Sequence, residues 1–182
     1  KYKNDFEYEF KNKSYFSPSL AEHVHIEYQK YNDYDHREKQ KIWNNAVKYY
    51  KKTGMVVTSA KRVYESDSLQ RFEVIMKDTA TQRAIRSLNI LKNGLVYTLS
   101  AQYDTTVGMS PWQTDFLKTF KPTDTLIGKD IFEYKFPNML KDLSSADSNK
   151  KYAATQSLSS VGFEKECIDD FVSYMKDTAA FF

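Results

Sequence analysis

The sequence predicts an α+β protein: an antiparallel sheet of about five to six strands, covered by two amphipathic helices and followed by a C-terminal helical extension. Three observations support this prediction. Runs of residues alternate between apolar and polar, an Asn93-Gly94 pair separates two of them, and two other segments repeat apolar residues at helical spacing. Aromatic residues make up 15% of the chain, and large aromatic side chains suit the faces of a sheet.

The first two strands are predicted from apolar residues at every second position. Aromatic residues recur at even positions over Tyr2–Phe10, which predicts a strand, and a loop follows through Ser17–Ser19. A second strand is predicted over Val24–Tyr28. One of its faces carries Val24, Ile26 and Tyr28, and the other carries His23, His25 and Glu27.

The first helix is predicted from Asp35 onward, where the spacing of apolar residues changes to that of a helix. Trp43 belongs to its apolar stripe, Asp35 and Glu38 have the spacing of a capping box, and Gly54 can end the helix. Four strands with short turns should follow, because the chain alternates again. We expect them at residues 55–64, 69–77, 82–92 and 95–103.

The Asn93-Gly94 pair predicts a tight hairpin, because both residues tolerate the positive φ of a type I′ turn. A second helix is predicted from Ser110, a preferred N-cap residue, with Pro111 at the first helical position and Trp112 on its apolar stripe. Packing both helices on the sheet would bury Trp43 and Trp112.

The remainder of the chain is predicted to be helical after a linker at residues 123–129. We expect a sheet domain at residues 1–126 and a short helical module of two to three helices at residues 127–182. Helices are expected at Phe136–Leu143, at Asn149–Val161 and after Gly162. The last helix carries an apolar stripe of Cys167, Ile168, Phe171, Val172 and Met175.

The composition excludes several classes of protein. No apolar run approaches the roughly 18 residues that cross a bilayer, so we expect a soluble chain without a transmembrane helix. A single cysteine, Cys167, rules out an internal disulfide and the cysteine-based metal sites. The net charge of +3 lies below that of dedicated nucleic-acid binders, so nucleic acid is not an expected partner. The basic segments Lys48–Lys52 and Arg83–Arg86 are interpreted as a helix end and an exposed sheet face.

The order of elements over Tyr2–Pro122 resembles the PsbP-like (Mog/PsbP-type) fold, and the segment that begins at Pro137 is similar to the start of a HEAT-type helical repeat. Families of the PsbP-like fold include many bacterial proteins and act mostly as non-catalytic binding or assembly factors. The resemblance implies such a role but transfers no site residue. An extracytoplasmic or periplasmic location is favoured over a cytoplasmic one.

Two candidate sites remain open. His23 and His25 point the same way from one strand and could share a metal with His36 or Glu27, although a solvated sheet face explains them as well. A second candidate is an aromatic platform for a sugar or peptide, formed by Tyr28, Tyr31 and Tyr34.

No catalytic residue and no cofactor is predicted. The five glycines are isolated, so no phosphate-binding loop can form, and no serine or cysteine nucleophile motif occurs. The sequence therefore predicts a non-catalytic binding or scaffolding module with a protein partner. The alternative is a ligand-binding or hydrolytic domain with a cleft between the sheet and the loop Asp104–Met109. The oligomeric state cannot be read from the sequence.

Overall fold

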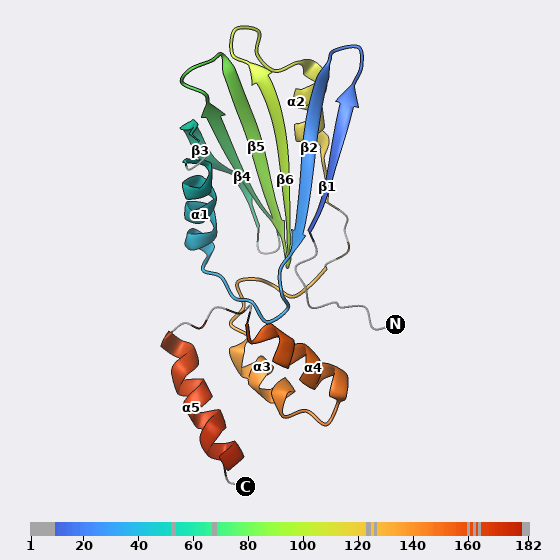
Figure 1. Cartoon of the computed structure of the whole chain (residues 1–182). Coiled ribbons are helices and arrows are strands. Elements are labelled where there is room, and N and C mark those ends of the chain that lie inside the picture. Colours follow the sequence, from blue (N-terminus) through green and yellow to red (C-terminus); the bar gives the residue numbers. More distant parts are fainter. Residues whose placement is uncertain are drawn as a thin grey trace.

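The computed structural model describes residues 10–51, 54–66, 69–122, 125, 127–159, 161, 163 and 165–179. It confirms the α+β class, with a single antiparallel sheet of six strands in the order β1-β2-β6-β5-β4-β3 (Figure 1). The strands are β1 (Phe10–Ser17), β2 (Glu22–Lys30), β3 (Val56–Glu65), β4 (Leu69–Lys77), β5 (Arg83–Lys92) and β6 (Leu95–Asp104).

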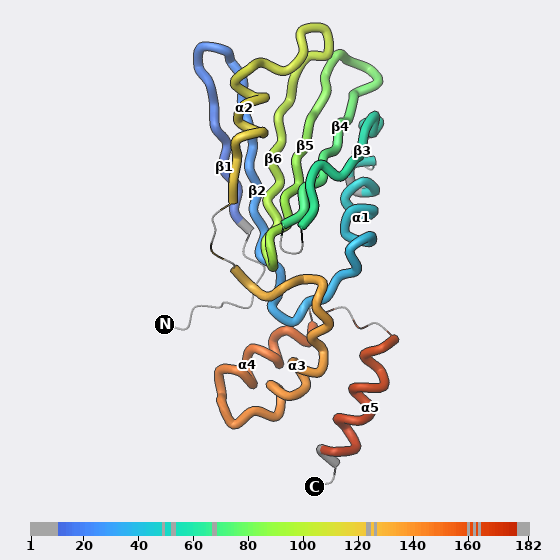
Figure 2. The backbone as a smooth tube through the Cα atoms, turned by 180° about the vertical axis from the view of Figure 1, so that it is seen from behind, coloured from blue at the N-terminus to red at the C-terminus, as the bar shows by residue number. Residues whose placement is uncertain are grey.

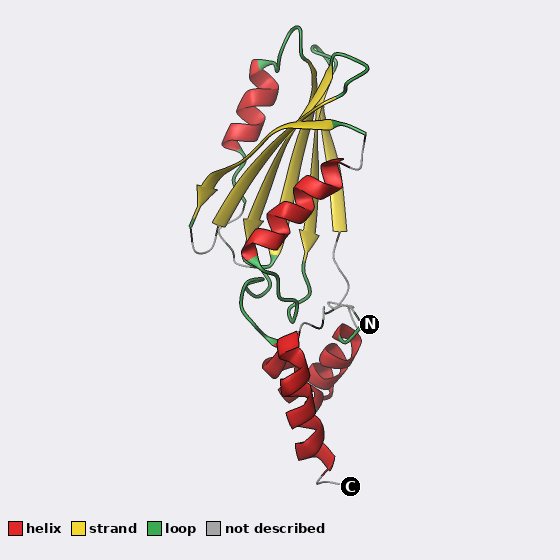
Figure 3. Cartoon of the chain, turned by 90° about the vertical axis from the view of Figure 1, so that its left-hand side faces the viewer, coloured by secondary structure: helices red, strands yellow, loops and turns green. Residues whose placement is uncertain are grey.

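Two helices cover opposite faces of the sheet, as the side view shows (Figure 3). Helix α1 (Lys39–Lys51) packs on β3 and β4, and helix α2 (Pro111–Thr119) packs across the other face on β2. Side chains alternate across each strand, so each helix meets a separate apolar set. The core under α1 includes Trp43, Phe72, Val74 and Met76, and the core under α2 includes Leu88, Ile90, Leu99 and Leu117.

The first described strand covers residues that follow the strand predicted over Tyr2–Phe10. Strand β1 begins at Phe10 and pairs with β2 through Ser17, in a register that sets Ser14 opposite His25. The predicted strand over residues 2–9 lies outside the described residues. The segment from Lys11 to Phe16 joins the sheet because β2 offers a free edge, even though most of its side chains are exposed.

The hairpin between β5 and β6 is confirmed at Asn93-Gly94, but its turn differs from the predicted type I′ form. Asn93 has a φ of +55°, whereas Gly94 does not take a positive φ. Gly94 is needed for a different reason: a Cβ at this position would lie 2.9 Å from the carbonyl oxygen of Lys129. The close approach of two backbones therefore requires this glycine, and it joins the sheet to the segment that leads into the tail.

The two predicted helix starts have different outcomes. At α2 the Ser110 hydroxyl accepts a hydrogen bond from the backbone N–H of Gln113 at 3.1 Å, as a capping residue should. Helix α1, however, begins at Lys39, and Asp35 does not cap it. The Asp35 carboxylate is buried and accepts two hydrogen bonds from Arg37.

The helical module consists of α3 (Phe136–Leu143), α4 (Ser148–Ser157) and α5 (Lys165–Ala179), and it lies below the end of the sheet where β2 finishes (Figures 1 and 2). Its core also takes a residue from the loop between β2 and α1. Tyr34 packs among Phe136, Met139, Leu140 and Ala154, and its hydroxyl donates to the Asp142 carboxylate at 2.8 Å. The predicted boundary at residue 126 lies outside the described residues.

Three further hydrogen bonds tie the module to the sheet. The side chain of Asn32 donates to the Ser157 hydroxyl at 2.9 Å, the Gly94 N–H donates to the Ile127 carbonyl, and the Arg37 N–H donates to the Ile131 carbonyl. Burial together with the Asp142 hydrogen bond raises the pKa of Tyr34, so this phenol stays protonated. Among the residues that the structure describes, no helix combines the length and apolar character required to cross a bilayer.

Candidate functional site

The most exposed apolar surface of the helical module lies along α5. Four large side chains of α5 and one that shortly precedes it are 40–58% exposed, although a helix in a folded module normally buries such a stripe. We call this surface the α5 apolar face; it consists of Phe163, Ile168, Phe171, Val172 and Met175.

Helix α5 is held to the module by its other side. Cys167 is buried in the module core, and the Tyr174 hydroxyl accepts a hydrogen bond from Ser144 at 2.9 Å. The Asp170 carboxylate accepts a hydrogen bond from Tyr134 at 2.7 Å, and partial burial together with this bond raises the pKa of the Tyr134 phenol. The predicted stripe is therefore split: Cys167 faces the core, and its four neighbours face outward.

A small apolar pocket opens beside this surface. It has a volume of about 350 Å³ and is lined by apolar side chains from α5 and the preceding loop, which are Leu158, Phe163, Cys167, Ile168, Phe171 and Val172. The lining is apolar apart from the Cys167 thiol, so the pocket has the size and character that suit an apolar side chain.

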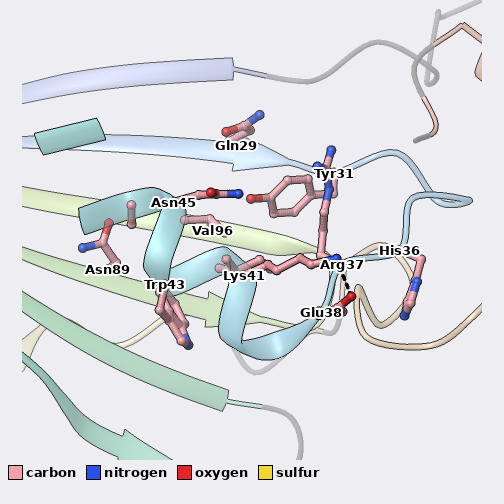
Figure 4. Close-up of a pocket in the computed structure, with 12 residues that line it drawn as sticks. Gln29, Tyr31, His36, Arg37, Glu38, Lys41, Trp43, Asn45, Asn89 and Val96 are labelled. Atoms are coloured by element: carbon pink, nitrogen blue, oxygen red, sulfur yellow. Dashed lines mark ion pairs between the residues drawn. The ribbon is translucent and has the colours of Figure 1, made fainter. Parts of the chain in front are cut away.

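A second pocket, of about 400 Å³, lies between α1 and the sheet (Figure 4). Helix α1 lies over the β3 and β4 side of this sheet face and leaves the half near β2 without a covering helix (Figure 1). Tyr31 and Asn45 point toward one another across the pocket, and Gln29 lies beside them. Within the described part of the chain, the side-chain amides of Gln29 and Asn45 make no hydrogen bond.

The charged groups of this pocket are already paired. Lys41 lies 2.5 Å from the Glu38 carboxylate, which is the ion pair drawn in Figure 4, and Arg37 lies 2.9 Å from the Asp35 carboxylate. A charged ligand would have to compete with these pairs, whereas a neutral one would not. The pocket therefore suits a small neutral molecule that exchanges hydrogen bonds with amides.

The cleft expected at the loop Asp104–Met109 corresponds to an open pocket of about 490 Å³, lined among others by Glu22, Gln102 and Asp104. The Asp104 carboxylate accepts two hydrogen bonds from Thr106, which lower the pKa of this carboxyl. An acid held ionised in an open pocket is a turn-stabilising group rather than a general acid.

His25 sits in a polar cluster on the open sheet face. One ring nitrogen lies 2.9 Å from the Ser14 hydroxyl, and the other lies 3.3 Å from the Glu27 carboxylate. The order serine, imidazole, carboxylate is that of a hydrolytic triad, but the His25 and Glu27 side chains are 34% and 43% exposed. All three groups are open to solvent, which weakens the electrostatic coupling through which an imidazole and a carboxylate activate a serine.

The structure places His23 and His25 on the same face of β2, as the alternation predicts. No group of three or more histidine, cysteine, aspartate or glutamate residues with the arrangement of a metal site occurs among the described residues. His36 lies in the loop between β2 and α1, where its ring contacts the ring of Tyr134. It therefore does not join His23 and His25.

The three tyrosines predicted as one platform go to three different places. Tyr28 packs against Tyr97 on the α2 side of the sheet, Tyr31 lines the pocket beside α1, and Tyr34 is buried in the helical module. A strand alternates its side chains, and the chain leaves the sheet after Lys30, so regular spacing in the sequence does not bring them together.

The two basic segments are also accounted for by packing. The Tyr50 hydroxyl is hydrogen-bonded to Ser87 at 2.9 Å, so its ring is turned toward the sheet. Arg86 lies 2.5 Å from the Glu73 carboxylate. The Tyr50 ring and the Arg86 guanidinium are therefore engaged in contacts with the sheet, and Lys48, Lys51 and Arg83 remain exposed.

With this geometry in view, the chain was compared with known proteins. No family model and no curated protein matches it.

Sequence reasoning found the α5 stripe but not its exposure. An amphipathic stripe is the same whether its own chain or a partner covers it, so periodicity cannot separate the two cases. The pocket beside α1 was missed, apart from Tyr31. Its polar lining comes from β2, α1 and β5. Strand pairing brings Gln29 and Asn89 together, and the packing of α1 on the sheet adds Asn45.

Proposed function

We propose that the chain is a non-catalytic binding module that docks a protein partner through the α5 apolar face. One observation supports this proposal above the others: five large apolar side chains stand 40–58% exposed in one patch beside an apolar pocket. Contiguous apolar patches of this kind mark interaction sites, because covering them is favourable. Each side chain, if covered, contributes on the order of 1 kcal/mol to binding, about half of the value for complete burial.

The remaining structure suits a scaffold for this face. Helix α5 is fixed to α3 by contacts on its inner side, and the module is joined to the sheet through Gly94, Asn32 and Tyr34. A rigid support lowers the entropy cost of binding. The resemblance to PsbP-like families, in which binding and assembly roles are common, agrees with this proposal.

A photo-crosslinking amino acid at position 172 tests the proposal. In the full chain, expressed in the cells that normally produce it, we expect an adduct whose second protein can be identified by mass spectrometry. The Ile168→Ser substitution should lower the yield at least fivefold, because it removes apolar contact from the centre of the face. It should change the stability of the chain by less than about 0.5 kcal/mol, since Ile168 is 58% exposed.

The matched control carries the same crosslinker at position 150, where an exposed lysine on α4 lies away from the face. We expect no adduct from this control. Equal adducts at positions 150 and 172, or none at position 172, would count against docking through α5.

A second candidate function is the binding of a small neutral polyhydroxyl molecule in the pocket beside α1. It is favoured by the side-chain amides of Gln29 and Asn45, which have no hydrogen-bond partner among the described residues and supply both donors and acceptors, and by the nearby Tyr31 ring. Titration with neutral monosaccharides should shift the amide NMR signals of β2 and α1. The Gln29→Leu/Asn45→Leu variant should abolish these shifts, and shifts that persist in this variant would rule out the pocket as their source.

A further inference from the structure

We propose that the partner of the α5 apolar face is a second copy of this chain, with the two α5 helices packed antiparallel about a twofold axis. This inference rests on the proposed function and names its partner. It depends on the spacing of the apolar residues along α5 and on the charges that flank them.

The apolar residues have the spacing of a helix–helix seam. Ile168, Phe171, Val172 and Met175 follow one another by three, one and three positions, so they form one straight row along the helix. When the helix is laid against a reversed copy of itself, Ile168 faces the partner's Met175 and Phe171 faces the partner's Val172 in the same register. All four side chains are then covered at once, and no apolar residue of the row is left over.

The flanking charges select the antiparallel arrangement. Asp169 and Lys176 are both exposed and lie along one side of this row, which we call the free flank. Cys167 and Tyr174 lie along the opposite side and pack on the module. In an antiparallel pair the free flanks of the two copies lie side by side, so Asp169 comes near the partner's Lys176. The twofold axis then also brings Lys176 near the partner's Asp169. Parallel helices would set the free flank of one copy against the module of the other, where Cys167 and Tyr174 are already covered.

The apolar pocket beside the row provides space for one side chain. Ile168 lines this pocket, and the antiparallel register places the partner's Met175 over Ile168. A methionine side chain is flexible enough to enter such a cavity. Each copy would therefore insert one side chain into the other, which gives two equivalent contacts.

Engineered disulfides test the register. In the full chain with Cys167→Ala, which removes the native thiol, Val172→Cys should form an intermolecular disulfide under mild oxidation, because the two copies of position 172 lie next to the axis. Ile168→Cys alone should not, since its two copies would lie about 10 Å apart along the helices, beyond the reach of a disulfide. A mixture of Ile168→Cys and Met175→Cys chains should form the mixed disulfide. Circular dichroism checks that each variant is folded.

Sedimentation of the disulfide-free chain supplies a second measurement. We expect a monomer–dimer equilibrium that Asp169→Lys weakens three- to tenfold and that the exchanged pair Asp169→Lys/Lys176→Asp restores. Equal disulfide yields from Ile168→Cys and Val172→Cys would indicate parallel helices and overturn the proposal. A chain that stays monomeric at all concentrations would also overturn the dimer proposal. The proposed docking through α5 would still stand in that case if the crosslinker at position 172 captured an identified protein other than this chain.

Discussion

Replacing Lys135 with alanine is expected to lower the free energy of unfolding by about 3 kcal/mol, because this lysine is a buried cation surrounded by acidic groups. Its side chain is fully buried, and its ammonium group donates to the Asp130 carbonyl at 2.5 Å. Burial lowers the pKa of Lys135, and the charges of Glu133, Asp130, Asp33 and Asp35 oppose this shift. Urea unfolding followed by circular dichroism measures the change.

The loss at Lys135 has a specific physical origin. Asp35 is 1% exposed, and one of its carboxylate oxygens has no hydrogen-bond partner among the described residues, whereas Arg37 donates to the other. Removal of the nearby Lys135 charge therefore leaves this carboxylate less well compensated. The Lys135→Met variant keeps most of the side-chain volume, yet it should still show most of the loss of about 3 kcal/mol that is expected for Lys135→Ala. The Lys141→Ala variant, at an exposed position of α3, should change it by less than about 0.5 kcal/mol. A Lys135→Met variant as stable as the parent would show that volume, not charge, matters here.

Replacing Trp43 with alanine is expected to cost about 3–5 kcal/mol, because this side chain anchors α1 to the sheet. The indole is 3% exposed and stacks on Phe72, with ring centroids 5.1 Å apart and planes inclined by 14°. Its N–H donates to the side-chain oxygen of Gln70 at 3.0 Å. Urea unfolding again measures the change in the free energy of unfolding. If α1 detaches, the sheet face that it covers should also become exposed to solvent.

Two controls separate the contributions of Trp43. The Trp43→Phe variant retains the stacked ring but leaves the Gln70 amide without a hydrogen bond, so it should cost only about 1–2 kcal/mol. The Trp112→Ala variant removes a half-buried indole from the other face and should cost less than Trp43→Ala. A cost below 1 kcal/mol for Trp43→Ala would mean that α1 is not held by this contact.

The apolar stripe of α5 shows how far sequence reasoning could reach at the candidate site. The residue types and their spacing predicted a helix with one apolar side, and the structure has this helix at Lys165–Ala179. Which part of that side is buried depends on the position of α3, whose residues precede α5 by more than twenty positions. Tertiary packing covered Cys167 and left Ile168 exposed, although the two are neighbours in the sequence.

The tyrosine and histidine predictions show the same limit. Alternation along β2 placed His23 and His25 on one face, because strand geometry is local. One partner of His25, however, is Ser14 on β1, beyond the segment over which alternation predicted a strand. Tyr31 and Tyr34 lie in a loop whose path depends on the docked module, so no periodicity could predict where their rings would go.

The sequence by itself determined the features that depend on neighbours along the chain: the strand and helix order from β2 onward, the Ser110 cap and the hairpin at Asn93-Gly94. Tertiary structure alone decided that the two helices cover opposite faces, that Gly94 admits the backbone of Lys129, and that the side chains of the α5 apolar face remain 40–58% exposed. The physical reason is that propensities, caps and turns act over a few residues, whereas burial is decided by segments that meet only when the chain folds.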